Sequence, residues 1–370
     1  MNFNCPICGN SKCYIILESQ NNSLARYGFL KKESIGSNLS ELELQILYCE
    51  NCDFAWNRKF LYSKIKYDSD QIIEAGNFSQ RYLDYQKSAA LSLNRAIGFK
   101  PETVVEIGAG AGIFIKELDA KRRIAIEPSD EAKKIDSSIE VYNEYFTQEK
   151  FNLSADLVAL RQVLEHIDNP IQFLRQILGS FKKSEKFYLY IEVPNSTLTF
   201  RGGRFYDYYY EHCNYFSIAS IIYISKLLGM RIVDLSTAMD GELISALFSS
   251  EQYDHTTIDK KLVSQKSEIL NKLLTKFNEN KKILAWGASG NGSQILNSLS
   301  INKNLIPFVI DSDINKHGLF LPGTSQKIIS PEEAVKYKPD VILVLTQFHK
   351  NEIGEACYRL FKNAEVCFLS

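Results

Sequence analysis

The strongest constraint on the fold is the run from Val104 to Gly112, in which a short apolar stretch leads into three alternating glycines. The β-branched residues before the glycines predict a buried strand, and the apolar residues Ile113 to Leu118 predict a helix after the turn. Glycines at Gly108, Gly110 and Gly112 let the backbone approach a ligand closely. The run therefore predicts a doubly wound α/β sheet with a ligand at this turn.

An acidic residue stands at the end of the next predicted strand, Arg123–Ile126. Glu127 follows this strand and has the chemistry to accept both hydroxyls of a ribose. The spacing that begins at Glu106 is E-x-G-x-G-x-G, which differs from the G-x-G-x-x-G of dinucleotide sites and is typical of methyltransferases that use S-adenosylmethionine (SAM). We predict that Glu106, the three glycines and Glu127 bind SAM. The competing interpretation is an ordinary tight turn.

Four regions are expected in the 370 residues. They are a cysteine module (1–58), a helical lead-in (59–100), a SAM-dependent methyltransferase domain (101–255), and a linking helix with a C-terminal domain (256–370). In the third region, strands are predicted at 103–107, 123–126, 156–160 and 187–192, with a closing antiparallel pair at 231–236 and 243–248. The predicted fold is therefore a class I methyltransferase sheet, which is Rossmann-like.

The C-terminal region repeats the pattern of a strand, a glycine-rich turn and an acid. Lys282–Trp286 leads into Gly287–Gly292, and the next predicted strand ends at Asp311. This pattern indicates a second Rossmann-like α/β domain. It either holds a nucleotide or serves only packing or dimerisation.

Charge and composition exclude some classes of partner. The formal net charge is −1, with 45% hydrophobic and 24% charged residues. Such a balanced chain has no field that attracts nucleic acid or an anionic membrane. No apolar run has the length of a signal peptide core or a membrane span, so we expect a cytoplasmic protein. The sequence does not predict its oligomeric state.

Four of the eight cysteines form two C-x-x-C pairs, Cys5 with Cys8 and Cys49 with Cys52. Disulfides are rare in the cytoplasm, and two such pairs together supply the four thiolates of a tetrahedral metal site. We therefore predict one structural zinc ion, with an inserted loop or hairpin near residues 19–41 between the pairs.

Two later segments contain the candidate proton-transferring groups. His166 follows the predicted strand 156–160, where it is either a base or substrate contact or a brace for the loop. Glu211 and His212 lie in a segment with five tyrosines, residues 205–217. This segment has a base, an orienting acid and hydroxyl donors for an oxyanion. Its competing interpretation is an aromatic packing cluster.

These motifs together resemble the three-domain, zinc-binding C-methyltransferases that act on nucleotide-linked keto-deoxysugars. The resemblance covers nearly the whole chain, and its most specific part runs from Asp311 through Lys316–Thr324 to Ser330–Glu332 and Lys338–Asp340. The other matching motifs are the two cysteine pairs, Val105–Gly108, Glu211-His212-x-x-Tyr215-Phe216-Ser217 and Ala285–Ala288.

The resemblance implies that His212 is the base α to a ketone, with Glu211 beside it. Tyr209, His166 and Tyr67 would be further pocket residues, and the C-terminal domain would help to hold the sugar nucleotide. The family has His where this chain has Tyr210. Two alternatives remain at this point: O- or N-methylation of a sugar or another cell-surface precursor, and a SAM-binding regulatory protein without turnover.

Overall fold

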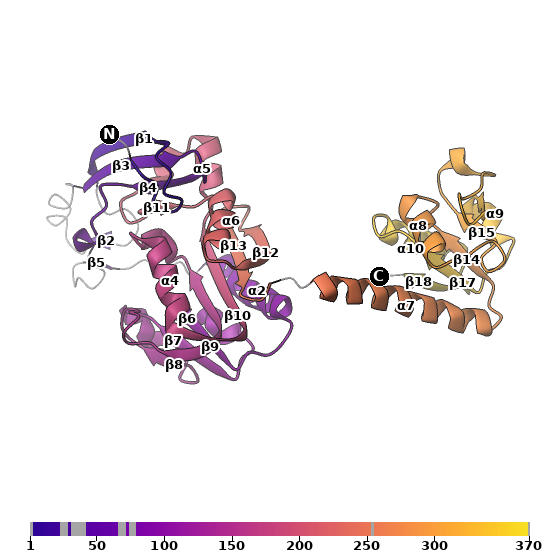
Figure 1. The fold of residues 1–370 in the computed structure, drawn as a ribbon, viewed down its shortest axis with the longest axis horizontal. Helices are drawn as coiled ribbons and strands as arrows, with labels where there is room; N and C mark the ends of the chain where they lie inside the picture. The colour runs from indigo at the N-terminus through magenta and orange to yellow at the C-terminus, as the bar shows by residue number, and fades with distance from the viewer. Residues whose placement is uncertain are drawn as a thin grey trace. The chain divides into compact units, whose positions relative to one another are not determined.

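The computed structural model describes residues 3–22, 29–30, 42–65, 72–73, 79–252 and 255–368. The chain divides into two compact units, Met1–Gln252 and Tyr253–Ser370. Each unit has β-sheet structure and hydrophobic cores of its own (Figure 1).

The first unit is built around a seven-stranded sheet with the order β12-β13-β10-β9-β6-β7-β8. Only β13 runs against its neighbours, between β10 and β12. This arrangement confirms the class I methyltransferase fold, including the predicted closing antiparallel pair. Its strands are β6 (Thr103–Ile107), β7 (Arg122–Ile126), β8 (Glu140–Tyr142), β9 (Leu153–Arg161), β10 (Phe181–Pro194), β12 (Arg231–Ala238) and β13 (Leu243–Ser249).

Both faces of this sheet are buried, because neighbouring residues of a strand point to opposite faces. Val105 and Ile107 of β6 belong to one core, with residues of α4 (Pro170–Ser180) and α6 (Ile218–Leu227). Val104 belongs to the other core, with residues of α2 (Gln80–Ile97) and α3 (Ile113–Glu117). The β-branched run that predicted a buried strand therefore supplies both cores.

Short elements complete the connections of this unit. They are the 3-10 helices η1 (Tyr62–Lys64), η2 (Asp130–Lys134), η3 (Leu164–His166) and η4 (Phe205–Asp207), the helix α5 (Ser196–Gly202), and the strand pair β2 (Phe29–Leu30) and β5 (Ile72–Ile73).

The N-terminal sheet includes a strand from far along the chain. Its order is β1-β3-β4-β11. Three strands come from the cysteine module, β1 (Cys13–Asn22), β3 (Leu42–Cys49) and β4 (Phe54–Asn57). The fourth, β11 (Asn214–Tyr215), belongs to the segment that follows His212, and Figure 1 shows it beside β4. The cysteine module is therefore completed by a strand that the sequence placed in the methyltransferase domain.

The second unit has a five-stranded, wholly parallel sheet in the order β16-β15-β14-β17-β18. This is the order 3-2-1-4-5 of a Rossmann-like sheet. The elements are α7 (His255–Asn278), β14 (Ile283–Trp286), α8 (Gly290–Ser298), β15 (Phe308–Ile310), η5 (Ile314–Lys316), β16 (Lys327–Ile329), α9 (Pro331–Val335), β17 (Val341–Val344), α10 (Lys350–Leu360) and β18 (Glu365–Phe368).

The expected linking helix is α7, and its second half packs on the core of the second unit. Leu273 is buried there, with Ile269, Leu270 and Phe277 against the same core. Leu262, which shares the apolar spacing, is exposed. None of the helices in the described ranges is long and apolar enough to cross a membrane.

Candidate active site

The glycine turn lies between β6 and α3, at the carboxyl edge of the first sheet. All three glycines have positive φ, 73° at Gly108, 54° at Gly110 and 72° at Gly112. A Cβ atom at Gly108 would lie 2.3 Å from Cγ2 of Val163, whereas a Cβ at Gly110 would meet nothing within 4 Å. Gly108 is thus required by packing, and the space beside Gly110 is open for a ligand to approach the backbone.

Glu127 fixes this turn from the end of β7. Its Oε2 accepts the Gly110 N–H at 2.7 Å, and its Oε1 accepts the Ser129 N–H at 2.9 Å. A carboxylate has about four acceptor positions, so two backbone bonds leave capacity for ribose hydroxyls. The predicted SAM contact is therefore compatible with the position of Glu127, which also holds the backbone that SAM would approach.

Glu106 lies beneath the turn and is almost fully buried. Burial raises the pKa of Glu106 to about 8, although the nearby Arg161 and a hydrogen bond from the Ile115 backbone act in the opposite direction. A carboxyl with this pKa is largely protonated at neutral pH. Its place in the structure is that of a support for the turn and for the first turn of α3.

A buried ionic network lies at the neighbouring strand ends, and the sequence analysis did not predict it. Arg161 ends β9 and donates to Glu192 of β10 at 2.8 Å and to Gln86 of α2 at 2.9 Å. Tyr85 of α2 donates to the second oxygen of Glu192 at 2.5 Å. The sequence signal that could have revealed the network is a charged residue, Arg161 or Glu192, near the end of each of two apolar strands.

The residue after Arg161 has a backbone conformation that is uncommon for a side chain. Gln162 has φ 53°, and its side-chain amide donates to the Tyr82 hydroxyl at 2.5 Å. Residues in this region of φ/ψ space are concentrated at functional sites. The network and Gln162 together attach α2 to the carboxyl edge, next to the glycine turn.

His212 is the centre of a cluster of titratable side chains and is 2% exposed. The Tyr209 hydroxyl lies 3.1 Å from Nε2 of His212, and the ring of His166 stands edge-to-face against the ring of His212 at 4.7 Å. The Glu165 Oε1 lies 3.9 Å from the same Nε2. The structure thus brings together three of the predicted pocket residues and adds Glu165.

Glu211 contributes to this cluster through its backbone. Its carbonyl oxygen lies 2.8 Å from Nδ1 of His166, while the residue itself is completely buried. A backbone carbonyl accepts hydrogen bonds only, so Nδ1 of His166 carries the proton in this contact and Nε2 is the acceptor nitrogen of the neutral ring. Tyr67, the remaining predicted pocket residue, lies outside the described residues.

The segment that bears His212 is clamped by the N-terminal sheet. The Asn57 N–H donates to the Cys213 carbonyl at 2.8 Å, and Asn214 and Tyr215 pair with Trp56 and Ala55 in the β4–β11 ladder. Residues 211–217 are all buried. The position of His212 therefore depends on the strand that follows the second cysteine pair.

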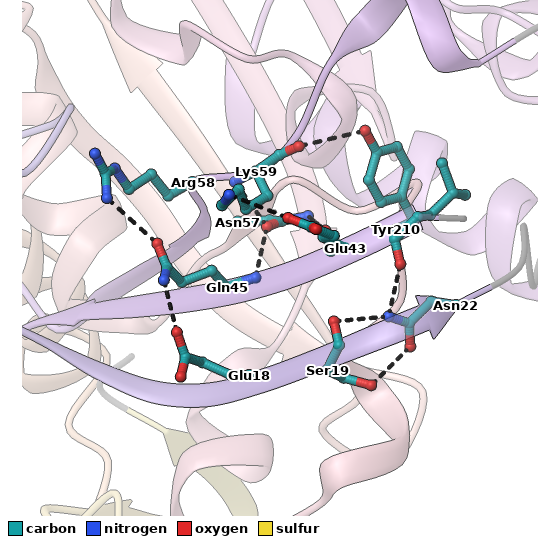
Figure 2. Close-up of polar contacts among 10 residues, drawn as sticks. Glu18, Ser19, Asn22, Glu43, Gln45, Asn57, Arg58, Lys59 and Tyr210 are labelled. Atoms are coloured by element: carbon teal, nitrogen blue, oxygen red, sulfur yellow. Dashed lines mark hydrogen bonds and ion pairs between the residues drawn. The ribbon is translucent and has the colours of Figure 1, made fainter. Parts of the chain in front are cut away.

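Tyr210 adds a second clamp next to His212. Its hydroxyl accepts the Leu61 N–H at 2.9 Å and donates to the Lys59 carbonyl at 3.4 Å. Figure 2 shows Tyr210 reaching the Lys59 backbone beside the polar contacts of Gln45 and Asn57. The residue that differs from the family motif is thus a buried connection between the segment after β4 and the His212 segment.

The four predicted metal ligands meet at one point of the N-terminal module. The sulfur atoms of Cys5, Cys8, Cys49 and Cys52 lie within 4.8 Å of one another. Cys5 and Cys52 are separated by 3.6 Å, and Cys8 and Cys49 by 3.5 Å. A tetrahedral zinc site with Zn–S bonds of about 2.3 Å has sulfur–sulfur separations of about 3.8 Å. The cluster therefore fits a four-thiolate zinc ion.

The two cysteine pairs have the same local backbone geometry. The Gly9 N–H donates to the Cys5 carbonyl at 2.9 Å, and the Asp53 N–H donates to the Cys49 carbonyl at 3.0 Å. Gly9 and Asp53 both have positive φ, 71° and 53°. Each pair is thus a tight turn that directs two sulfur atoms to one side, which is the arrangement that the C-x-x-C spacing predicts.

Comparison with known proteins identifies both parts of the chain. Residues 79–235 match the family described as a methyltransferase domain, and residues 234–366 match the family described as the C-methyltransferase C-terminal domain. The C-methyltransferase NovU of Streptomyces niveus is 22% identical over 387 residues, which cover 94% of this chain and 90% of that protein.

Two solved methyltransferase structures are similar to part of the chain. The plantazolicin methyltransferase BpumL, solved with a monoazolic desmethylPZN analog and SAH, is 15% identical, with a TM-score of 0.37 over 46% of this chain and 84% of its own. A SAM-dependent methyltransferase of Thermotoga maritima, a possible histamine N-methyltransferase, is 18% identical, with a TM-score of 0.35 over 46% and 94%. These matches show a SAM-dependent methyltransferase whose residues 234–366 are similar to the C-methyltransferase C-terminal domain.

Proposed function

We propose that this chain transfers the methyl group of SAM to a carbon atom of a nucleotide-linked keto sugar, with His212 as the base. The observation that carries the proposal is the buried cluster of His212, Tyr209, His166 and Glu165. The segment that bears Glu165 and His166 continues from Val163, which contacts Gly108 of the turn. The matched C-methyltransferase domain and the sequence resemblance support carbon as the acceptor atom and a sugar nucleotide as the substrate.

A carbon next to a ketone becomes a nucleophile only when it loses a proton. In the proposed reaction, Nε2 of His212 takes this proton, and the electron pair of the C–H bond moves to the ketone oxygen as an enolate. Tyr209 donates its O–H to that oxygen, which frees Nε2 from the Tyr209 contact. Bound SAM supplies an electrophilic methyl group, and as the carbon–carbon bond forms, the bond from this methyl to sulfur breaks.

The decisive experiment measures exchange of the α-proton. Wild-type enzyme in deuterated water should exchange this proton of a nucleotide-linked keto sugar, and His212→Ala should lower exchange and methylation by about 10²–10⁴-fold while SAM affinity is retained. Tyr209→Phe should also lose activity, whereas Tyr206→Phe is the matched control, because Tyr206 is 65% exposed on the same segment. Methylation of an oxygen atom without exchange, or an unchanged rate in His212→Ala, contradicts the proposal.

We also propose that Cys5, Cys8, Cys49 and Cys52 hold one zinc ion that stabilises the fold and takes no part in the chemistry. Four protein ligands leave no open position for a substrate or water, which supports a structural role. Elemental analysis should find about one zinc per chain. Cys8→Ser should lose this zinc, while Cys367→Ser, a half-buried cysteine of the second unit, should keep it.

Removal of the metal should affect the His212 segment before it affects SAM binding. The metal module contributes β4, and β4 pairs with β11 directly after His212 and Cys213. Amide exchange of residues 213–216 should therefore increase in chelated protein, with SAM affinity retained. A metal-free preparation with unchanged exchange in these residues contradicts the structural role.

A further inference from the structure

We propose that Glu165 is the positioning residue of the catalytic base: its buried carboxylate holds the His212 ring and balances the charge that His212 acquires with the substrate proton. This inference rests on the proposed function and deepens it. The sequence pointed to Glu211, the neighbour of His212, for this role, and the resemblance to the C-methyltransferases also placed Glu211 there. The geometry points instead to a residue on a different element.

Glu165 lies in η3, directly after β9, and is completely buried. Its Oε1 is 3.9 Å from Nε2 of His212, which is longer than a hydrogen bond and within ion-pair distance when the imidazole is protonated. The same Nε2 faces the Tyr209 hydroxyl at 3.1 Å. The carboxylate therefore faces the nitrogen that takes the proton in the proposed reaction.

Three hydrogen bonds fix η3 against the residues that follow His212. The Cys213 thiol donates to the Glu165 carbonyl at 3.4 Å. The Asn214 side-chain amide donates to the Leu164 carbonyl at 3.2 Å and to the Ile167 carbonyl at 2.5 Å. The separation of Glu165 and His212 is thus set by a rigid contact between two chain segments.

Glu211 has a different role in the same cluster. Its carbonyl oxygen receives the N–H of His166, which stands edge-to-face against His212. Glu211 therefore acts on the orientation of His166 through the backbone, and a change of its side-chain charge leaves this bond in place.

The charge of Glu165 matters because its carboxylate lies against the His212 ring, and Asp168 and Glu211 are further acids near this segment. Tyr209 and His166 face the ring directly, and Cys213 and Glu211 are its chain neighbours. Burial raises the pKa of the Cys213 thiol, which therefore remains uncharged. An imidazolium in such a site is stabilised by a carboxylate at ion-pair distance, because the interior screens charge weakly.

The test compares Glu165→Gln with Glu165→Asp and Glu211→Gln. Glu165→Gln keeps the size of the side chain and removes the charge, so kcat should fall about 10- to 100-fold with little change in KM for the sugar nucleotide. The acid limb of the pH–rate profile should move to lower pH by about one unit or more, because the imidazolium loses its counter-charge. Glu165→Asp should restore part of the rate and of the limb, and Glu211→Gln should move the limb less than Glu165→Gln does.

Three results would overturn the inference. The first is an acid limb that stays in place in Glu165→Gln while activity falls, which indicates a purely structural residue. The second is a limb that moves at least as far in Glu211→Gln as in Glu165→Gln. The third is a second metal ion per chain, beyond the zinc of the four cysteines, that is present in the wild type and lost in Glu165→Gln.

Two controls separate the possible failures. Exchange of the α-proton in the wild type is measured first, because its absence overturns the proposed function, whereas exchange with an unmoved limb overturns only the role of Glu165. If Glu165→Gln does not fold, the ring titration of His212 in the wild type is followed by NMR. It should titrate at higher pH than an unperturbed imidazole, whose pKa is about 6.5, and a lower midpoint overturns the inference.

Discussion

The two units of this chain have the same pattern of hydrogen bonds at the turn after their first strand. In the first unit, the Gly108 N–H donates to the Ile126 carbonyl and the Gly110 N–H to Glu127; in the second, the Gly287 N–H donates to the Ile310 carbonyl. In the second unit, Asp311 takes the place of Glu127 and accepts the Ala288 N–H at 2.9 Å. In both units an acid after the second strand holds the glycine turn after the first.

The surroundings of the two acids differ. Asp311 also pairs with Lys316 at 3.0 Å and accepts the Asp313 N–H, so its charge is balanced within the unit. Glu127 has the Gly110 and Ser129 backbone groups and no ion pair within the described residues. The comparison teaches that a Rossmann-like turn alone does not determine the chemistry, which comes from the side chains placed at the strand ends.

The first test of the difference between the two turns adds a methyl group to the first glycine of each turn. Gly108→Ala should destabilise the first unit by about 2–4 kcal/mol, because a left-handed backbone and a 2.3 Å contact with Val163 act together. Gly287 has φ 114°, so Gly287→Ala is also strained, but its Cβ would meet Thr346 only at 3.5 Å, an ordinary van der Waals contact. The steric part of the cost is therefore absent, and the loss of stability should be smaller.

The two tryptophans make this measurement specific. Trp56 lies in the first unit and Trp286 in the second, and the sequence contains no others. Unfolding followed by fluorescence in Trp56→Phe and Trp286→Phe backgrounds reports each unit separately. Equal destabilisation by the two alanine substitutions would show that backbone strain, and not the Val163 contact, determines the cost.

The second test removes the two acids. Glu127→Ala should weaken SAM binding by about 1.5–3 kcal/mol, the value of hydrogen bonds to a charged group. Asp311→Ala is the matched control and should leave SAM affinity unchanged in calorimetry. A loss of affinity in Asp311→Ala, or none in Glu127→Ala, would show that the assignment of SAM to the first turn is wrong.

The third test uses the position two residues before the first glycine, which is Glu106 in one unit and Ala285 in the other. Because burial raises the pKa of Glu106 to about 8, the native state keeps a proton that the unfolded chain releases above its ordinary pKa. The stability of the first unit should therefore decrease as the pH rises toward 8.

Glu106→Gln removes this proton uptake and should flatten the pH dependence. The difference between wild type and variant should change by about 1 kcal/mol between pH 6.5 and 7.5, within the limit of about 1.4 kcal/mol per pH unit for one proton. Denaturant titrations at these two pH values, read through Trp56, measure it. A constant difference would mean that Glu106 is ionised in the native state.

The parts of the molecule that sequence analysis could predict are those encoded by neighbouring residues. The strand, the glycines and Glu127 follow one another within a short segment, and the structure confirms the class I sheet that they predict. The C-x-x-C spacing likewise predicts a tight turn, because the two cysteines of each pair are separated by only two residues.

The contacts that define the candidate site were not predictable in this way. Glu165 approaches His212 because η3 is fastened to Asn214, a contact between residues 50 positions apart. Arg161 and Glu192 end different strands and meet only in the folded sheet. A pattern of residue types carries no information on such pairs, and the adjacent Glu211 was therefore the more natural candidate for orienting His212.

The pairing of β4 with β11 has a consequence for the synthesis of the protein on the ribosome. Leu61 and Tyr210, which make the neighbouring contact, are 149 residues apart. At about 5–20 residues per second, synthesis leaves the edge of β4 without its partner for about 7–30 s. An open strand edge invites pairing with other chains. The nascent N-terminal module therefore passes through an aggregation-prone interval, which ends only when the segment with His212 emerges and completes its sheet.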